Sequence, residues 1–410
     1  MATRYYTGAA KAVAQVNTIT PANVNIGNTF TLTWNGKTLI YTAAAATVAD
    51  VTAGLVALVA ASEEPEWQTV TAADITTALT LTANTPGQPF TQTSSAAGGT
   101  ATLVTATTTA NSGPEQYDLA ANWSGGVAPT GTNVDTVIIE GAFNLRYGTL
   151  AGVTAARLIV RDFSGTIGLP PVNADGGYPE YRSQYLLMSA TILDVMENVT
   201  SGMMRLNVGS AACTATVYST GGATVPTLNA LTFVGTHASN VLNVLSGSVG
   251  VATESGEAAT LTLVKTGSGG FAGQLELTLG IGCTLTNAIL SGGNVRFYAD
   301  LSGYLYVYGG TVTLIDDPDI AGVVYVYQDG TLVINGTPTL GGAVEVFGGK
   351  VDCTQDVRNF TCSGNVTLHR GSTWDDRYAR GSYGGDVLLD GCDWADVTAR
   401  FGPNHTYTIA

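Results

Sequence analysis

The sequence predicts a mostly β protein, in which a parallel β-solenoid (β-helix) of the right-handed type follows a small α+β domain. Between residues 304 and 397, two alternating apolar strands joined by a glycine recur as a repeated phrase. The recurring glycines are Gly310, Gly330, Gly349, Gly371 and Gly391. Their period of roughly 20 residues fits one coil of a solenoid. Gly accounts for 51 of 410 residues and charged residues for 11%, which favours many strands joined by tight turns.

The apolar positions of the repeat predict one continuous core. Residues three and five before each corner glycine, and two and four after it, are mostly aliphatic. In the first copy they are Leu305, Val307, Val312 and Leu314. Because side chains alternate along a strand, these positions share a face. One coil of about 20 residues cannot bury that face alone, so successive coils must stack about 4.8 Å apart.

Aromatic side chains recur at the outward positions of the same repeat. Tyr308, Phe347 and His369 stand two residues before the glycine, and a one-residue insertion adds Tyr327 to this column. A second column is expected from Tyr306 and Tyr325. Three interpretations remain open: a ladder that favours strand formation, an interface with sister chains, or contact with a flat glycan. The sister-chain interface is preferred, and its candidate residues are Tyr306, Tyr308, Tyr325, Tyr327 and Phe347.

Residues 1–110 predict an α+β docking module of order ββαββ. Strands are expected at 29–35 and 38–42 around a Gly36-Lys37 turn, and again at 68–70 and 79–83. Between these pairs, TVADVTAGLVALVAA predicts a helix over 47–61 with Thr47 as its cap and Asp50 in its first turn. A hairpin tip at 84–89 is expected to close the module.

Residues 111–410 predict the solenoid. The boundary is placed near Asn111, after the Ala/Thr-rich link ATLVTATTTANSGP. Trp123 is expected to cap the first coil, because an uncovered coil would expose its core and a strand edge. A loop insertion near 167–185 breaks the rhythm and suggests contact with a neighbouring subunit, or a ligand pocket. Near 374–410 we expect a distal cap that contains Trp374, Trp394 and Phe401.

Charge and hydropathy exclude several classes of function. A net charge of −15 with only 16 Lys and Arg argues against a nucleic-acid surface, which needs clustered basic residues. No stretch approaches the roughly 20 apolar residues that cross a bilayer, so no membrane partner is expected. No signal peptide is evident, which predicts synthesis in a cytoplasm. The five cysteines lack C-x-x-C spacing and are expected to be buried free thiols.

No catalytic, cofactor-binding or metal-binding residues are predicted. The best acidic groups, Asp316-Asp317-Pro318-Asp319 and Asp375-Asp376, lie between strands, where Asp usually forms turns. A glycosidase would need two carboxylates held about 5 to 10 Å apart. The three histidines, His237, His369 and His405, lack the spacing of a zinc site. Weak calcium binding by the acidic groups remains open.

Three phrases of the first quarter occur in order: GNTFTLTWNGKTLIYTA, TVADVTAGLVALVAAS and ALTLTANTPGQPFTQT. They resemble a small domain found in bacteriophage and prophage virion proteins of tail and capsid-surface type. Further on, NSGPEQYDLAANWSGGVAPTGTNVDTVIIEG resembles the opening coil of secreted and virion β-solenoids. The resemblance of the first quarter implies a docking or structural module and does not identify an activity.

The expected function is that of a non-enzymatic virion structural protein. Residues 1–110 would contact other virion proteins, and the solenoid would stand on the capsid surface as a decoration or head-fibre protein, as a homotrimer. The alternatives are a tail fibre or tailspike-like adhesin, which would contact a host-surface glycan, and a polysaccharide depolymerase on a β-helix. A bacterial adhesin is disfavoured by the missing signal peptide.

Overall fold

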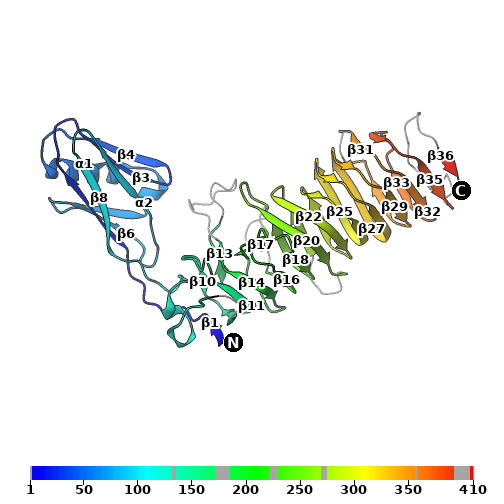
Figure 1. Ribbon diagram of the computed structural model, residues 1–410, viewed down its shortest axis with the longest axis horizontal. Coiled ribbons are helices and arrows are strands. Elements are labelled where there is room, and N and C mark those ends of the chain that lie inside the picture. The colour runs from blue at the N-terminus through cyan, green and yellow to red at the C-terminus, as the bar shows by residue number, and fades with distance from the viewer. Residues whose placement is uncertain are drawn as a thin grey trace.

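The computed structural model describes residues 2–131, 135–170, 185–221, 229–268, 275–355 and 358–391, and the backbone of 407–409. It is mostly β, with a large parallel sheet of many strands that run in a row from β9 to β36 (Figure 1). Two antiparallel sheets and the α-helices, formed by residues 16–109, lie at the other end of the structure (Figure 1).

The elements before residue 110 are β1 (Ala2–Tyr5), β2 (Val16–Ala22), β3 (Thr29–Trp34), β4 (Lys37–Thr42), α1 (Val48–Ala61), α2 (Pro65–Gln68), β5 (Val70–Asp74), β6 (Leu79–Ala83), β7 (Thr93–Ala97) and β8 (Thr102–Thr109). Two short 3-10 helices follow, η1 (Ala120–Asn122) and η2 (Ser124–Gly126).

The first strands of the parallel sheet are β9 (Asp135–Gly141), β10 (Asn144–Leu145), β11 (Thr154–Phe163), β12 (Thr166–Ile167), β13 (Leu186–Leu187), β14 (Ser189–Val195), β15 (Met204–Asn207), β16 (Thr214–Val217), β17 (Leu231–Val234), β18 (Val241–Val244), β19 (Gly247–Val251), β20 (Ala259–Thr266), β21 (Leu275–Leu279), β22 (Cys283–Leu290), β23 (Asn294–Phe297) and β24 (Asp300–Leu301). The rest are β25 (Leu305–Asp316), β26 (Asp319–Ile320), β27 (Val324–Gly336), β28 (Thr339–Leu340), β29 (Val344–Phe347), β30 (Lys350–Asp352), β31 (Phe360–Cys362), β32 (Val366–His369), β33 (Thr373–Asp375), β34 (Gly381–Tyr383), β35 (Val387–Asp390) and β36 (Tyr407–Ile409).

The strands of the parallel sheet pair with strands about one sequence repeat further on. Leu305 pairs with Val324, Val324 with Val344, Val344 with Val366, and Val366 with Val387. Each of these steps along the chain is close to the spacing of the corner glycines. The sequence repeat therefore sets the register of the sheet.

The predicted core columns are confirmed. Leu305, Val307, Val312 and Leu314 are each 0% exposed, and their partners on the following strands belong to the same buried cluster. Trp123, expected at the start of this core, is buried there against Tyr6, with ring centroids 5.1 Å apart. Trp374 is fully buried in the same cluster, while Trp394 and Phe401 lie outside the described residues.

The corner glycines serve two different purposes. Gly310 has a φ of +77°, a backbone conformation that glycine adopts without steric cost. Glycine is also needed for close approach of the backbone, since an added Cβ would lie 2.3 Å from the carbonyl oxygen of Gly293 at Gly310 and 2.4 Å from that of Val307 at Gly330. The shared spacing of the glycines thus reflects both turn geometry and packing.

The ββαββ order predicted for 1–110 occurs as β3, β4, α1, β5 and β6, but it is incomplete, because strands β2, β7 and β8 were not predicted. The antiparallel strands form a four-stranded sheet, β5-β6-β2-β8, and a three-stranded sheet, β4-β3-β7. Residues 65–68 form a short helix with Pro65 in its first turn, and the strand expected at 68–70 starts only at Val70. The Ala/Thr-rich link is strand β8, which pairs with β2 in antiparallel register.

Strand β1 does not belong to these antiparallel sheets. Ala2–Tyr5 pairs in parallel with β9, from Ala2 with Asp135 to Tyr5 with Ile138. The side chain of Asp135 also accepts a hydrogen bond from the backbone N–H of Ala2, at 3.2 Å. The beginning of the chain therefore lies against the start of the parallel sheet (Figure 1).

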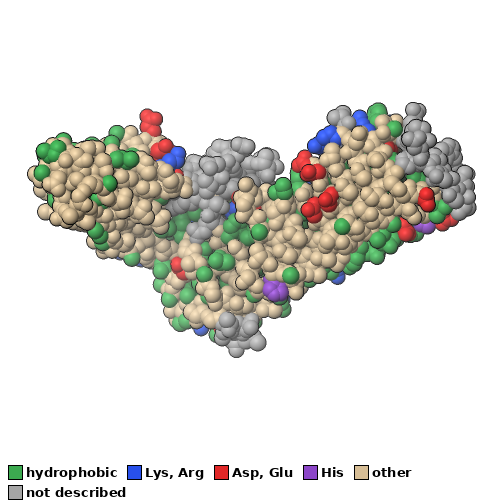
Figure 2. Space-filling model, turned by 45° about the horizontal axis from the view of Figure 1, so that its top comes forward, with side chains coloured by type: hydrophobic (Ala, Val, Ile, Leu, Met, Phe, Trp, Pro, Cys, Tyr) green, Lys and Arg blue, Asp and Glu red, His purple; other side chains and the backbone are tan. Residues whose placement is uncertain are grey.

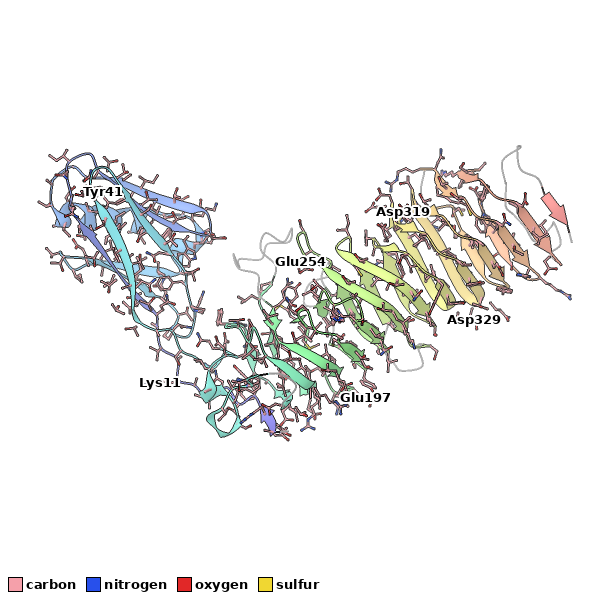
Figure 3. The ribbon with its side chains drawn as sticks, in the orientation of Figure 1. Lys11, Tyr41, Glu197, Glu254, Asp319 and Asp329 are labelled. Carbon is pink, nitrogen blue, oxygen red and sulfur yellow. The ribbon has the colours of Figure 1, made fainter. Side chains whose placement is uncertain are left out.

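Helix α1 is joined to the edge strand β4 through Asp50. Its carboxylate accepts hydrogen bonds from the Tyr41 hydroxyl, at 3.0 Å, and from the backbone N–H groups of Ala44 and Ala45, at 2.8 and 3.0 Å. Gly54, one turn on, leaves space for the Tyr41 ring, since an added Cβ would lie 2.1 Å from that ring. Figure 3 shows Tyr41 among the strands at this end of the structure. The predicted cap is confirmed, because Thr47 Oγ1 accepts from the Asp50 N–H.

Replacing Asp50 with Asn is expected to reduce stability at neutral pH and to matter less in acid. The Ala45 N–H, followed by the Tyr41 hydroxyl and the Ala44 N–H, holds the pKa of Asp50 below its ordinary value. A carboxyl group whose pKa is lowered by folding stabilises the folded state at pH values above its unfolded-state pKa. This stabilisation is lost as the pH falls through the folded-state pKa. Denaturant unfolding at several pH values measures the difference in stability between the wild-type protein and Asp50→Asn. Glu63→Gln is the control, because Glu63 is exposed. A difference that does not change with pH would contradict this assignment.

Candidate functional site

The predicted aromatic residues lie on the outward side of four paired strands. Along β25 the side chains alternate, so Leu305 and Val307 are buried while Tyr306 is half-buried and Tyr308 is 44% exposed. The same alternation on β27 and β29 places Tyr325, Tyr327 and Phe347 outward, and β32 adds His369. The structure therefore brings all five candidate residues together on one face.

The outer column is a continuous stack of rings. Tyr308 and Tyr327 have ring centroids 4.4 Å apart, Tyr327 and Phe347 5.3 Å, and Phe347 and His369 4.1 Å. The planes of these neighbours differ by only 16°, 15° and 8°. The pairing register shifts between Val307 and Gly309, which is the effect expected from the one-residue insertion.

The inner column is shorter and is linked to the outer one. Tyr306 and Tyr325 are stacked with centroids 4.8 Å apart and planes 9° apart. Tyr306 also stacks beside Tyr308, with centroids 5.8 Å apart. On the next strand Tyr325 is followed by Glu345, which ends the inner column.

The outer column ends among charged groups. The Nδ1 of His369 lies 2.9 Å from a carboxylate oxygen of Asp390, and its Nε2 lies 3.9 Å from Glu345. Figure 2 shows hydrophobic side chains along the lower edge of the parallel sheet toward its C-terminal end, with acidic and histidine side chains beside them. The stack is therefore an apolar strip with a polar end.

The ring orientation limits what this strip can bind. Because the rings stack face to face along the row of strands, their faces are used against one another and their edges and hydroxyls point outward. A sugar ring that packs on an aromatic side chain needs an open ring face. Burial raises the pKa of Tyr327, so its phenol stays protonated at neutral pH. The ring faces between neighbouring members of the outer column are therefore not open to a sugar ring.

The acidic groups act mainly in turns and local ion pairs. Asp376 is fully buried, and its carboxylate accepts from the backbone N–H groups of Arg380 and Gly381 and from the Tyr383 hydroxyl. Asp375 binds Arg377, which lowers the pKa of that carboxyl. Figure 3 places Asp319 and Asp329 at opposite edges of the row of strands. The carboxylates of Asp375 and Asp376 are thus engaged by an ion pair and hydrogen bonds within their own turn.

Sequence analysis missed a buried ionic cluster around Arg205. Both carboxylate oxygens of Glu254 accept from its guanidinium, the Nη2 contact being 2.8 Å. Glu257 lies 3.3 Å from the same Nη2, and the ring of Tyr185 covers the guanidinium at 4.3 Å. The Tyr185 hydroxyl donates to Glu257. Glu254 lies at the upper edge of the parallel sheet (Figure 3).

A pocket of about 430 Å³ opens beside this cluster, lined partly by Tyr185, Asn207, Thr236 and Glu257. Burial raises the pKa of Glu257. All four carboxylate oxygens of the two glutamates are engaged, since the remaining oxygen of Glu257 accepts from the Glu254 N–H at 3.1 Å. The cluster therefore fixes the 254–257 loop and Tyr185 to β15. Of the predicted insertion, residues 171–184 lie outside the described residues.

Thiols and histidines offer no assembled site within the described ranges. Cys213, Cys283, Cys353 and Cys362 are buried free thiols, as predicted, and burial raises the pKa of Cys213 to about 12. Cys392 and His405 lie outside the described residues. Among residues whose placement is described, no three His, Cys, Asp or Glu side chains gather closely enough to hold a metal ion. No helix in the same ranges has the length and apolar character needed to cross a membrane.

Comparisons with protein-family models, with curated proteins and with solved structures each found no match.

Proposed function

We propose that this chain is a non-enzymatic structural protein of a bacteriophage particle. Residues 1–110 dock it to the particle, and residues 111–410 form a parallel β-solenoid of the right-handed type on the capsid surface. The observation that supports this best is the strand register, which advances by one sequence repeat per pairing over one continuous core. The assignment to a phage rests on the resemblance of the first quarter and of the opening coil.

A solenoid accounts for three features together. Parallel strands pair with strands one repeat further on, the inward columns merge into one buried cluster, and the glycines recur at the bends. In such an architecture each coil contacts only its neighbours, and the protein is extended and stiff. A stiff body of this kind is suited to present a surface.

The proposed assembly is a homotrimer in which the aromatic strip faces a sister chain. Tyr308 is 44% exposed, although aromatic side chains are costly to leave in water. The hydroxyls and ring edges that point outward match the polar and apolar character of protein interfaces, where Tyr is enriched. Other virion proteins are the proposed partners of residues 1–110.

Replacing Tyr308 and Tyr327 with Ser together is expected to shift the protein toward monomers. The change removes two stacked rings from the strip, and buried Tyr side chains are among the residues that contribute most to binding at interfaces. Light scattering coupled to size exclusion measures the mass in solution. Tyr378→Ser is the matched control, because Tyr378 is 58% exposed and lies off the strip. An unchanged mass of the double variant would refute the interface.

Imaging of the particle tests where the protein is held. Labelled antibody against the chain is expected to decorate capsid lattice positions. Label at the tail would favour the tail fibre or tailspike-like alternative, and complete absence from particles would refute the virion proposal.

The rival enzymatic function is tested separately. Glu254 and Glu257 are two carboxylates beside a pocket, which is the arrangement that a polysaccharide depolymerase would need. Because Arg205 binds both, we expect no shortening of host capsule or cell-wall glycans by the pure protein. Measurable shortening that Glu257→Gln abolishes would establish the depolymerase instead.

A further inference from the structure

Two tyrosines of the outer column are held as a preformed pair of phenols. Tyr308 and Tyr327 stack with centroids 4.4 Å apart and planes 16° apart. Rings stacked at this distance also bring the Cε carbons next to their hydroxyls within reach of each other. Oxidised tyrosines form carbon–carbon bonds at these Cε positions.

We propose that Tyr308 and Tyr327 are a site of oxidative cross-linking to dityrosine by a one-electron oxidant. Each phenol loses one electron to the oxidant and one proton to water. The two phenoxyl radicals then form a bond between one Cε carbon of each ring. The hydrogens on these carbons move to the phenol oxygens, so both hydroxyls are restored and the net loss is two electrons and two protons.

Access and stacking both favour this pair. In the unassembled chain Tyr308 is 44% exposed, so an oxidant in solution reaches its ring, while Tyr327 is half-buried on the neighbouring strand. Stacking holds the partner in place during the short lifetime of the radical, so the coupling is intramolecular and fast.

The product would connect two neighbouring strands of the parallel sheet. Tyr308 lies on β25 and Tyr327 on β27, which pair over most of their length. A covalent bond between them closes a loop of the chain and constrains the unfolded state, as a disulfide does. The cross-linked protein would resist unfolding and proteolysis more than the unmodified chain.

The test exposes the full-length protein, at low concentration, to light with a ruthenium tris-bipyridyl photo-oxidant and persulfate. Digestion before aspartates separates the two rings, because Asp300, Asp316, Asp319 and Asp329 bound the peptides 300–315 and 319–328. We expect these peptides joined, two hydrogen atoms lighter than their sum, in protein that runs as a single chain on a denaturing gel. Dityrosine fluorescence follows the same product.

Phe variants identify the pair while keeping the rings stacked. Tyr308→Phe and Tyr327→Phe are each expected to lose the joined peptide, while Tyr306→Phe and the exposed Tyr378→Phe retain it. Melting curves confirm that the variants are folded. Joined peptide that survives in both Tyr308→Phe and Tyr327→Phe would overturn the proposal. Cross-links confined to dimers, or oxidation of Tyr378 without any joined peptide, would overturn it as well.

Discussion

Replacement of Arg205 with Leu is expected to lower the free energy of unfolding by about 3–5 kcal/mol, the range for removing one partner of a buried ion pair. The Arg205 side chain is 3% exposed and binds two glutamates, of which Glu257 is 10% exposed. Without the guanidinium, burial would penalise the charge of Glu257, whose pKa it already raises. The Tyr185 ring would also lose the cation that it covers.

Urea unfolding and hydrogen exchange of the 254–257 loop measure this effect. The exposed Arg296, on β23, provides a matched control, and Arg296→Leu should change stability by no more than about 0.5 kcal/mol. Adding Glu257→Gln to Arg205→Leu is expected to recover part of the loss, because the uncompensated charge is removed. Equal destabilisation by both arginine variants, or no recovery, would show that the cluster does not act as an ion pair.

Patterns with a short period could be predicted from the sequence. Alternation along a strand and the recurrence of glycine were enough to identify the buried columns around Leu305 and Val312, because each sequence repeat carries the same local constraints. The aromatic columns followed from the same register, including the effect of the insertion at Gln328 and Asp329. Mostly β structure with a large parallel sheet could thus be expected without knowledge of any contact.

Contacts between distant segments could not be predicted. Arg205 meets Glu254 and Glu257, and β1 pairs with β9, across separations in the chain that are longer than one repeat and carry no periodic signal. Strand β2 was missed because one of its buried positions is Asn17, which bonds Gln92 and Gln15 in a polar network. A polar residue facing inward hides the alternation on which strand prediction depends.

The residues of the candidate site could be predicted from the sequence, but the orientation of their rings could not. The register shows which aromatic residues share a column, but ring orientation depends on the side chains above and below. The 16° between the planes of Tyr308 and Tyr327 turns both faces toward each other and exposes the edges. No sequence pattern encodes this angle.

Gly342→Ala is expected to destabilise the parallel sheet strongly, whereas Gly341→Ala at the next position should be nearly neutral. An added Cβ at Gly342 would lie 2.2 Å from the carbonyl oxygen of Gly322. The same crowding occurs one repeat earlier, where an added Cβ at Gly322 would lie 1.5 Å from the carbonyl oxygen of Gly303. These neighbours are backbone atoms, which cannot move aside as a side chain can. At Gly341 the nearest atom would be 3.4 Å away, an ordinary contact.

The methyl group of an alanine at position 342 would push apart two neighbouring segments that are hydrogen-bonded to each other on both sides of it. The hydrogen bonds from Gly341 N to Ile320 O and from Val324 N to Ala343 O, at 2.8 and 2.9 Å, flank it on both sides. Overpacking of this kind costs about 1–3 kcal/mol and sometimes more. Neither Gly341 nor Gly342 has a positive φ, so the backbone conformation suits alanine about equally at both positions.

Hydrogen exchange of the Gly341 and Val324 amides, together with denaturant unfolding of both variants, separates the effect of close packing from the loss of glycine flexibility. Only close packing makes Gly342→Ala the more damaging change, and equal effects at both positions would mean that the strands at this bend are not held by glycine contact.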